Sequence, residues 1–163
     1  MRYILRRREV VADDWARLGE EVAEGAALII PLAELRADAA RWGSWPGRLG
    51  VRLAPTDRVE DLAAELPRLS LVAVEFPNAG DGRGYSQGRL LRARFGFRGE
   101  LRAVGGGVKQ DQVFVLARCG FETFELAPGE DLEAARRALT RYTVAYQPGA
   151  ADVTLERQRF VTR

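Results

Sequence analysis

Short apolar runs that are typical of buried strands recur along the chain. A basic stretch, Arg2–Val11, is the first strand candidate, and a charged stretch near the end, Asp152–Phe160, alternates Val153 and Leu155 with polar residues. Alternation of this kind predicts a strand with one face buried. The apolar runs between these two are Ala27–Ile30, Leu49–Leu53, Leu69–Phe76, Glu100–Val104 and Thr123–Leu126.

Apolar residues at helical spacing fill most of the intervals between the predicted strands. In the first interval, Asp13 or Asp14 is expected to cap a helix that carries Trp15, Leu18 and Val22 on one face. The remaining predicted helices contain, in chain order, Leu35, Ala39 and Trp42; Val59, Leu62 and Leu66 after a cap at Thr56 or Asp57; Leu90, Leu91 and Ala93; Val113–Cys119; and Leu132, Ala135, Leu139, Tyr142 and Tyr146.

Strand followed by helix, several times over, predicts an α/β fold with a mainly parallel sheet of repeated βα units. At 163 residues the chain is too short for an eight-unit barrel of about 250 residues. An open doubly wound sheet and a partial (β/α) barrel both remain possible. Because such a sheet leaves strand edges bare, we expect cover from the chain ends, a homodimer or a hetero-complex. No linker divides the chain, so residues 1–163 are interpreted as a single α/β domain.

Composition excludes several classes of function. The 25 basic residues face 23 acidic ones, a balance that argues against nucleic-acid binding. The chain has no histidine and a single cysteine, Cys119, so we expect neither a metal site nor a bound cofactor. Cys119 is interpreted as a packing residue without a redox role. Since no segment has the length of a membrane span or a signal peptide, we expect no membrane association and a cytoplasmic protein.

A glycine-rich loop, residues 77–84, leaves the carboxyl end of one predicted strand and enters a helix. Ligand sites of parallel α/β folds occur at this position. The following helix offers amide donors to an anion, and Arg83 and Arg89 would add charge-assisted hydrogen bonds. A tight turn in which Asp81 caps the helix and pairs with Arg83 accounts for the same residues. The loop matches neither the P-loop nor the dinucleotide-binding motif.

A second loop, residues 105–112, also follows a strand and precedes a helix. Right-handed parallel connections should place it at the same rim of the sheet as the first loop. Lys109 would supply a cation there, although a solvated helix start accounts for the residues equally well. The candidate anion- or partner-binding residues are Asp81, Arg83, Gly84, Tyr85, Ser86, Arg89, Lys109, Gln110 and Asp111.

The segment Leu71–Leu126 resembles a known family. The resemblance rests on Phe76-Pro77, Asp81 to Ser86, Arg89 to Arg92, Gly96-Phe97, Gly99 to Gly105, Asp111-Gln112 and Arg118 to Phe121. These motifs are similar to an uncharacterised bacterial family described as probable oxidoreductases of sulfite reduction, typically encoded beside the sulfite reductase haemoprotein. The chain departs from the pattern at Gly106-Gly107, where the family would have an acidic residue and a shorter connection.

The resemblance implies a place in sulfur assimilation and cysteine biosynthesis. We therefore expect an accessory protein of assimilatory sulfite reduction that binds the reductase haemoprotein or an anionic ligand at the rim. One alternative is an oxidoreductase that borrows a cofactor, with Asp81, Tyr85 and Asp111 as proton-transfer groups. Another is a small-molecule-binding or isomerising domain on barrel-like βα units, in which Glu75 at a strand end acts as a base.

Overall fold

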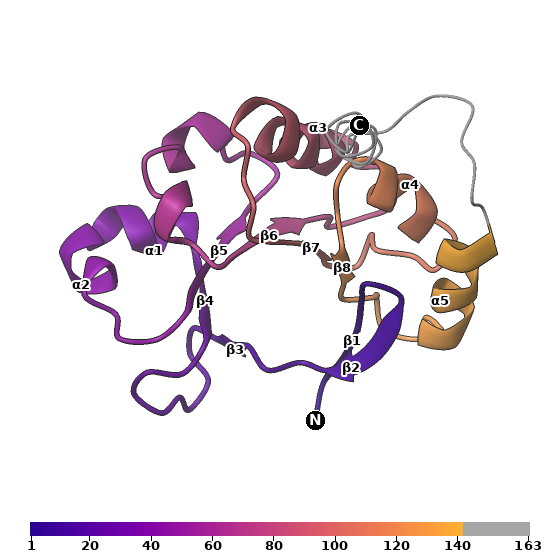
Figure 1. Ribbon diagram of the computed structural model, residues 1–163, viewed down its shortest axis with the longest axis horizontal. Helices are drawn as coiled ribbons and strands as arrows, with labels where there is room; N and C mark the ends of the chain where they lie inside the picture. Colours follow the sequence, from indigo (N-terminus) through magenta and orange to yellow (C-terminus); the bar gives the residue numbers. More distant parts are fainter. Residues whose placement is uncertain (142–163) are drawn as a thin grey trace, which may run out of the picture.

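Eight strands form one curled sheet in the computed structural model, which describes residues 1–141. The sheet has the order β2-β1-β8-β7-β6-β5-β4-β3. Neighbours from β3 to β8 are parallel, whereas β1 is antiparallel to both β2 and β8 (Figure 1). The strands are β1 (Tyr3–Arg6), β2 (Glu9–Ala12), β3 (Ala16–Arg17), β4 (Leu28–Pro31), β5 (Leu49–Leu53), β6 (Leu71–Glu75), β7 (Glu100–Val104) and β8 (Thr123–Phe124).

The helices cover the convex side of the sheet (Figure 1). Their apolar faces pack on strand residues of one parity, such as Ile30, Val51, Val72 and Leu101, all of which are buried. The helices are α1 (Leu32–Ala37), α2 (Ala39–Gly43), the 3₁₀ turns η1 (Val59–Leu62) and η2 (Leu66–Arg68), α3 (Arg83–Arg89) with its π-helical continuation η3 (Leu90–Arg94), α4 (Val113–Arg118) and α5 (Leu132–Arg141).

The strand order decides between the two predicted architectures. A doubly wound sheet reverses its strand order at a switch point. Here β3 to β8 lie side by side in chain order, as in a (β/α) barrel, and the sheet curls into a half-barrel. The α/β class is confirmed and the doubly wound alternative is wrong. The repeated βα unit is confirmed only in part, because several connections contain short 3₁₀ turns or irregular chain.

The N-terminal region differs from the sequence-based prediction. The stretch predicted as one strand, Arg2–Val11, is a hairpin whose turn residues Arg7 and Arg8 have the positive φ of a two-residue connection. The helix predicted after Asp13 is wrong: Ala16–Arg17 forms β3, and irregular chain leads to β4. The Asp13 carboxylate accepts the Trp15 amide at 3.3 Å and pairs with Arg17 and Arg102, and no helix follows it.

The helix predicted after Asp57 and the elements predicted beyond residue 141 have different outcomes. The helix predicted after Asp57 is replaced by η1 and η2, and Pro67, which follows Leu66, disfavours helical backbone there. The Asp57 side chain accepts the Ala54 amide at 2.7 Å and so closes the preceding turn. Tyr142, Tyr146 and Asp152–Phe160 lie outside the described residues. Within residues 1–141, no helix combines the length and apolar character needed to cross a bilayer.

Candidate functional site

The concave face of the half-barrel carries charged side chains on otherwise apolar strands. Arg52, Ala73 and Arg102 are register partners on β5, β6 and β7, so their side chains share this face. Two residues further along β6, Glu75 is on the same face. The face opposite the helices therefore combines ionic side chains with a small apolar cluster of Trp15, Ala27, Ile29, Leu71, Ala73 and Val104.

A buried ion pair lies at the centre of the concave face. Arg102 is fully buried, and its Nη1 lies 2.9 Å from the Asp13 carboxylate, whose side chain is 1% exposed. Its Nη2 donates to Glu100 at 2.8 Å. Burial opposes ionisation of Asp13, but Arg102 and then Arg17 hold the pKa of this carboxyl below its usual value. Asp13 belongs to the three-residue linker between β2 and β3, the two edge strands of the sheet. The Asp13–Arg102 ion pair therefore attaches this linker to β7.

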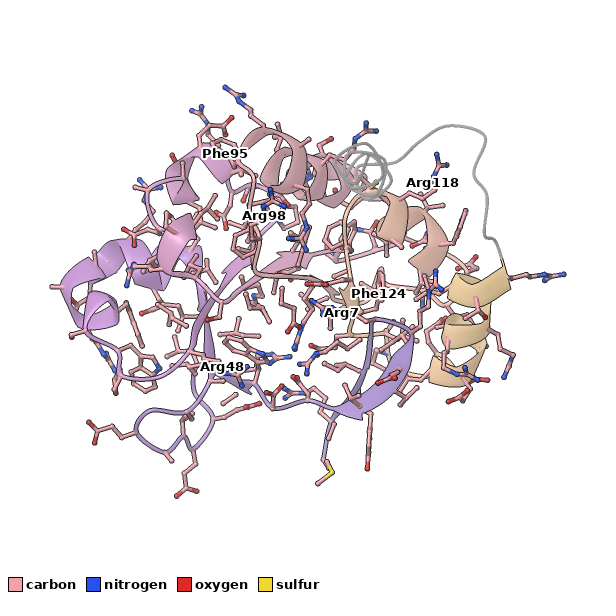
Figure 2. The ribbon with its side chains drawn as sticks, viewed as in Figure 1. Arg7, Arg48, Phe95, Arg98, Arg118 and Phe124 are labelled. Atoms are coloured by element: carbon pink, nitrogen blue, oxygen red, sulfur yellow. The ribbon has the colours of Figure 1, made fainter. Side chains whose placement is uncertain are left out.

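Further ion pairs surround the buried one. Arg6 pairs with Asp14 at 2.8 Å, and Arg48 approaches the same carboxylate at 2.6 Å. Arg48 also lies over the Trp15 ring, 4.9 Å from its centre, and projects toward the segment that leads into β3 (Figure 2). These contacts hold the pKa of Asp14 at about 2, against the opposing effect of its burial. This part of the concave face is structural, because each charge has a partner.

A small pocket opens on the concave face at the carboxyl ends of the parallel strands. Its volume is about 140 Å³, and a shallower depression of about 120 Å³ adjoins it through shared residues. The C-terminal edge of the strands is where (β/α) folds build their ligand sites. This mouth pocket is lined by Arg17, Ile29, Arg52, Ala73, Glu75, Val104, Gly105 and Glu125.

The charged groups of the mouth pocket are not equally engaged. Arg17 contacts Glu125 at 2.5 Å and Asp13 at 3.1 Å, so its guanidinium is already held. Arg52 Nε and Glu75 Oε2 lie 3.8 Å apart, with the two side chains 47% and 30% exposed. Neither makes a side-chain hydrogen bond to any residue in the range 1–141. Arg52 and Glu75 are therefore the two groups that a ligand can engage without breaking a strong bond.

The two glycine-rich loops meet beside the mouth pocket. The Gly107 amide donates to the Phe76 carbonyl at 2.8 Å, which joins the start of one loop to the start of the other. Gly105 has φ +110°, and a Cβ atom there would lie 2.5 Å from the Phe76 carbonyl oxygen. Glycine is required at Gly105 both for its conformation and for this approach.

The first loop uses its predicted site residues mainly within itself. Asp81 accepts the Arg83 amide at 3.1 Å and pairs with the Arg83 guanidinium at 2.6 and 3.0 Å. These bonds hold the pKa of Asp81 at about 2. Gly84 presses against the Phe76 ring, and Tyr85 meets the same ring edge-on at 5.3 Å. Burial raises the pKa of Tyr85.

Ser86 and Arg89 are exposed on α3, one turn apart. No ion pair involves Arg89 within the described part of the chain. Its charge lies near the half-buried thiol of Cys119 at the end of α4, where burial raises the thiol pKa and Arg89 lowers it to a smaller extent. A raised pKa keeps the thiol protonated, which fits a packing role. Residues 1–141 contain no group of three His, Cys, Asp or Glu side chains placed to hold a metal ion.

The second loop is tied to the start of α5. Lys109 lies 3.2 Å from Glu130, and the Gln110 amide donates to the same carboxylate at 2.9 Å. The Gln110 side-chain oxygen accepts the Asp131 amide at 3.0 Å. Asp111 is exposed, and its charge contributes to the raised pKa of Tyr85, so the two loops are electrostatic neighbours. The function of these residues as one surface stays a prediction.

Arg92 and Phe121, which belong to the motifs of the sequence resemblance, and the neighbouring Gly88 pack the fold. The Arg92 guanidinium donates to the carbonyls of Phe97, Gly99 and Gly120 at 2.7 to 3.0 Å. Gly88 allows the Phe121 ring to approach α3, since a Cβ atom would lie 2.4 Å from that ring. Arg92, Gly88 and Phe121 therefore hold the helices against the sheet and do not form a site.

Three charged residues of the mouth pocket, Arg17, Arg52 and Glu125, escaped the sequence-based prediction. Arg17 lay inside the wrongly predicted helix, and Glu125 follows a strand that is only two residues long. Arg52 carried a detectable signal, because it is a charged residue inside the apolar run Leu49–Leu53. Arg102 carries the same signal in β7. A charge within a buried parallel strand is costly unless it is paired or functional.

Comparison with known proteins places the chain in a family. No curated protein matches it. Residues 50–155, more than half of the 163, match the model of a family described as bacterial proteins of unknown function, DUF934. The matched range includes β5 from its second residue, β6 to β8 and, of the mouth pocket, every residue except Arg17 and Ile29. The chain belongs to this bacterial family of unknown function.

Proposed function

We propose that this chain binds a small polar ligand in the mouth pocket and acts as an accessory protein of assimilatory sulfite reduction. The observation that carries the binding proposal is the pair Arg52 and Glu75. Two opposite charges at the carboxyl ends of adjacent parallel strands line a pocket, 3.8 Å apart and without hydrogen bonds to residues 1–141. In (β/α) folds, side chains at this edge bind and act on ligands, while the opposite edge serves stability.

The stability of the fold does not explain the Arg52–Glu75 pair. A partly exposed ion pair at this separation contributes between about 0 and 1 kcal/mol. The Arg102 pair differs, because its burial makes each partner necessary to the other. Arg52 and Glu75 are therefore candidates for ligand binding and Arg102 for the fold.

The sulfite-reduction part of the proposal rests on the sequence resemblance over Leu71–Leu126. That segment supplies Ala73, Glu75, Val104, Gly105 and Glu125 to the mouth pocket. The same segment contains the two loops beside the pocket. A ligand site and a partner surface would then share one edge of the sheet.

The ligand site is tested by growth with sulfite as the sole sulfur source, in a strain deleted for this gene. The double variant Arg52→Ala/Glu75→Ala should fold with an unchanged melting temperature and fail to complement. Its matched control is Arg58→Ala/Glu60→Ala, an exposed pair at 3.9 Å outside the mouth pocket, which should complement fully. Full complementation by the Arg52/Glu75 variant would show that the mouth pocket is not the working site.

The exposed surface of Arg83 and Arg89 is a second candidate, for docking the reductase haemoprotein. The observation that favours it is that Arg89 is exposed and has no ion pair within residues 1–141. Each single variant, Arg83→Ala or Arg89→Ala, should weaken association by about 1.5–3 kcal/mol, the range for hydrogen bonds to charged groups. Co-purification with the haemoprotein and thermal stability are measured together, and a stable Arg83→Ala variant that binds normally would exclude a role for the first loop.

A further inference from the structure

Building on the proposed ligand site, we infer that the mouth pocket binds a small zwitterion: a molecule with an ammonium and a carboxylate on a short skeleton, as in a small α-amino acid. Arg52 would receive the carboxylate and Glu75 the ammonium. The feature that assigns this ligand class is the placement of one loosely held guanidinium beside one loosely held carboxylate.

The charges of the mouth pocket cancel. Arg17 and Arg52 face Glu75 and Glu125, and Arg17 is already bonded to Glu125 and Asp13. A ligand therefore meets a site without net charge that presents both signs on neighbouring strands. Such a site distinguishes ligands by the arrangement of their charges and not by their total charge.

Ligands with one sign of charge are poorly matched to this arrangement. A doubly charged oxyanion would gain from Arg52 but would face Glu75, whose carboxylate lies within 4 Å of that guanidinium. A lone ammonium would gain from Glu75 and face Arg52 in the same way. A zwitterion satisfies both groups and replaces a 3.8 Å contact with two charge-assisted hydrogen bonds.

The size and lining of the mouth pocket restrict the carbon skeleton of the ligand. A cavity of about 150 Å³ accommodates benzene, which has six non-hydrogen atoms, so a pocket of about 140 Å³ accommodates a ligand of about that size. Ile29, Ala73 and Val104 supply an apolar lining, and Gly105 contributes no side chain. With the charged groups of the zwitterion in place, a short alkyl or hydroxyalkyl substituent fits this space, whereas a large aromatic side chain would have to extend into the adjoining depression.

The test is titration calorimetry on the full chain with defined probes. L-Alanine, glycine and L-serine are compared with propionate and ethylammonium, which each keep one charge, with sulfite, and with L-tryptophan as a size control. L-Alanine should bind at least about tenfold more tightly than propionate, ethylammonium or sulfite, and L-tryptophan should bind more weakly than L-alanine. R52Q and E75Q should each weaken L-alanine binding at least about tenfold, while R58Q should leave it unchanged.

The outcomes separate this inference from the proposed function. Sulfite binding that exceeds L-alanine binding, is lost in R52Q and is tightened in E75Q would overturn the zwitterion and retain a ligand in the mouth pocket. Absence of saturable zwitterion binding at millimolar concentration, or binding that neither substitution alters, would also overturn it. In either case the growth experiment with Arg52→Ala/Glu75→Ala decides independently whether the mouth pocket is the working site.

Discussion

Replacing Asp13 by asparagine tests whether the linker between β2 and β3 is fastened to the opposite wall of the half-barrel. The substitution keeps the shape of the side chain and its ability to accept the Trp15 amide. It removes the negative charge that faces Arg102 at 2.9 Å and Arg17 at 3.1 Å. The asparagine N–H₂ group also replaces the oxygen that accepts from Arg17, so the effect reports the loss of the charge together with the loss of this acceptor.

The expected loss follows from the partners that remain. Breaking a buried ion pair by removing one partner costs about 3–5 kcal/mol. Arg102 keeps Glu100 at 2.8 Å, which lowers the expected loss to about 2–3 kcal/mol, the upper range for one charged hydrogen bond. At about 2–4 °C per kcal/mol for a chain of this size, the melting temperature should fall by about 4–12 °C.

Chemical and thermal unfolding at neutral pH measure this loss, with Asp61→Asn as the control. Asp61 pairs with Arg36 at 3.2 Å on the surface, and its loss should cost at most about 1 kcal/mol. The folded-state pKa of Asp13 is below the unfolded value, so its contribution is present above about pH 4 and is lost as the pH falls through the folded pKa. The difference between wild type and Asp13→Asn should shrink accordingly. Equal stability of the two proteins at neutral pH would refute the fastening role.

Two further substitutions test packing outside the concave face. Gly84→Ala should destabilise the fold by about 1–3 kcal/mol, because its Cβ atom would lie 2.5 Å from the Phe76 ring. The control Gly82→Ala faces open space and should change stability far less. Equal losses of stability in urea unfolding would contradict this prediction. Cys119→Ser should fold, with a loss of about 1 kcal/mol in the free energy of unfolding, and should support growth on sulfite, since the thiol is a packing group. A folded Cys119→Ser variant that does not support growth would indicate a redox role.

The strands were largely predictable because a parallel strand covered by helices is apolar along its length. Leu49–Leu53 and Glu100–Val104 have the predicted bounds, while the hairpin turn at Arg7 and Arg8 lacks the glycine or asparagine that usually marks one. The spacing of Trp15 and Leu18 suits a helix, but Trp15 is buried between the sheet and Arg48. Tertiary contacts overrode the local pattern there.

The candidate site was predictable only where its residues follow strands visible in the sequence. Glu75 was identified from its place at the end of an apolar run, and the structure lines the mouth pocket with it. Arg17 and Glu125 could not be identified, because the register that brings them together depends on the curl of the whole sheet. The assignment of Asp81 and Arg83 to a functional surface stays open to the test above, since their mutual ion pair also fits a simple turn.

The pairing of β1 with β8 has a consequence for how the chain folds during synthesis. Leu5 and Phe124 are register partners, although nearly the whole described chain separates them. The hairpin of β1 and β2 is synthesised before β8, and it cannot dock until β8 has been made. Contacts of such long sequence separation slow folding, because the entropy of closing the loop is lost before the contacts form. We expect nascent chains that stop before Thr123 to leave the edge of β7 exposed, and the protein to be most vulnerable to aggregation at that length.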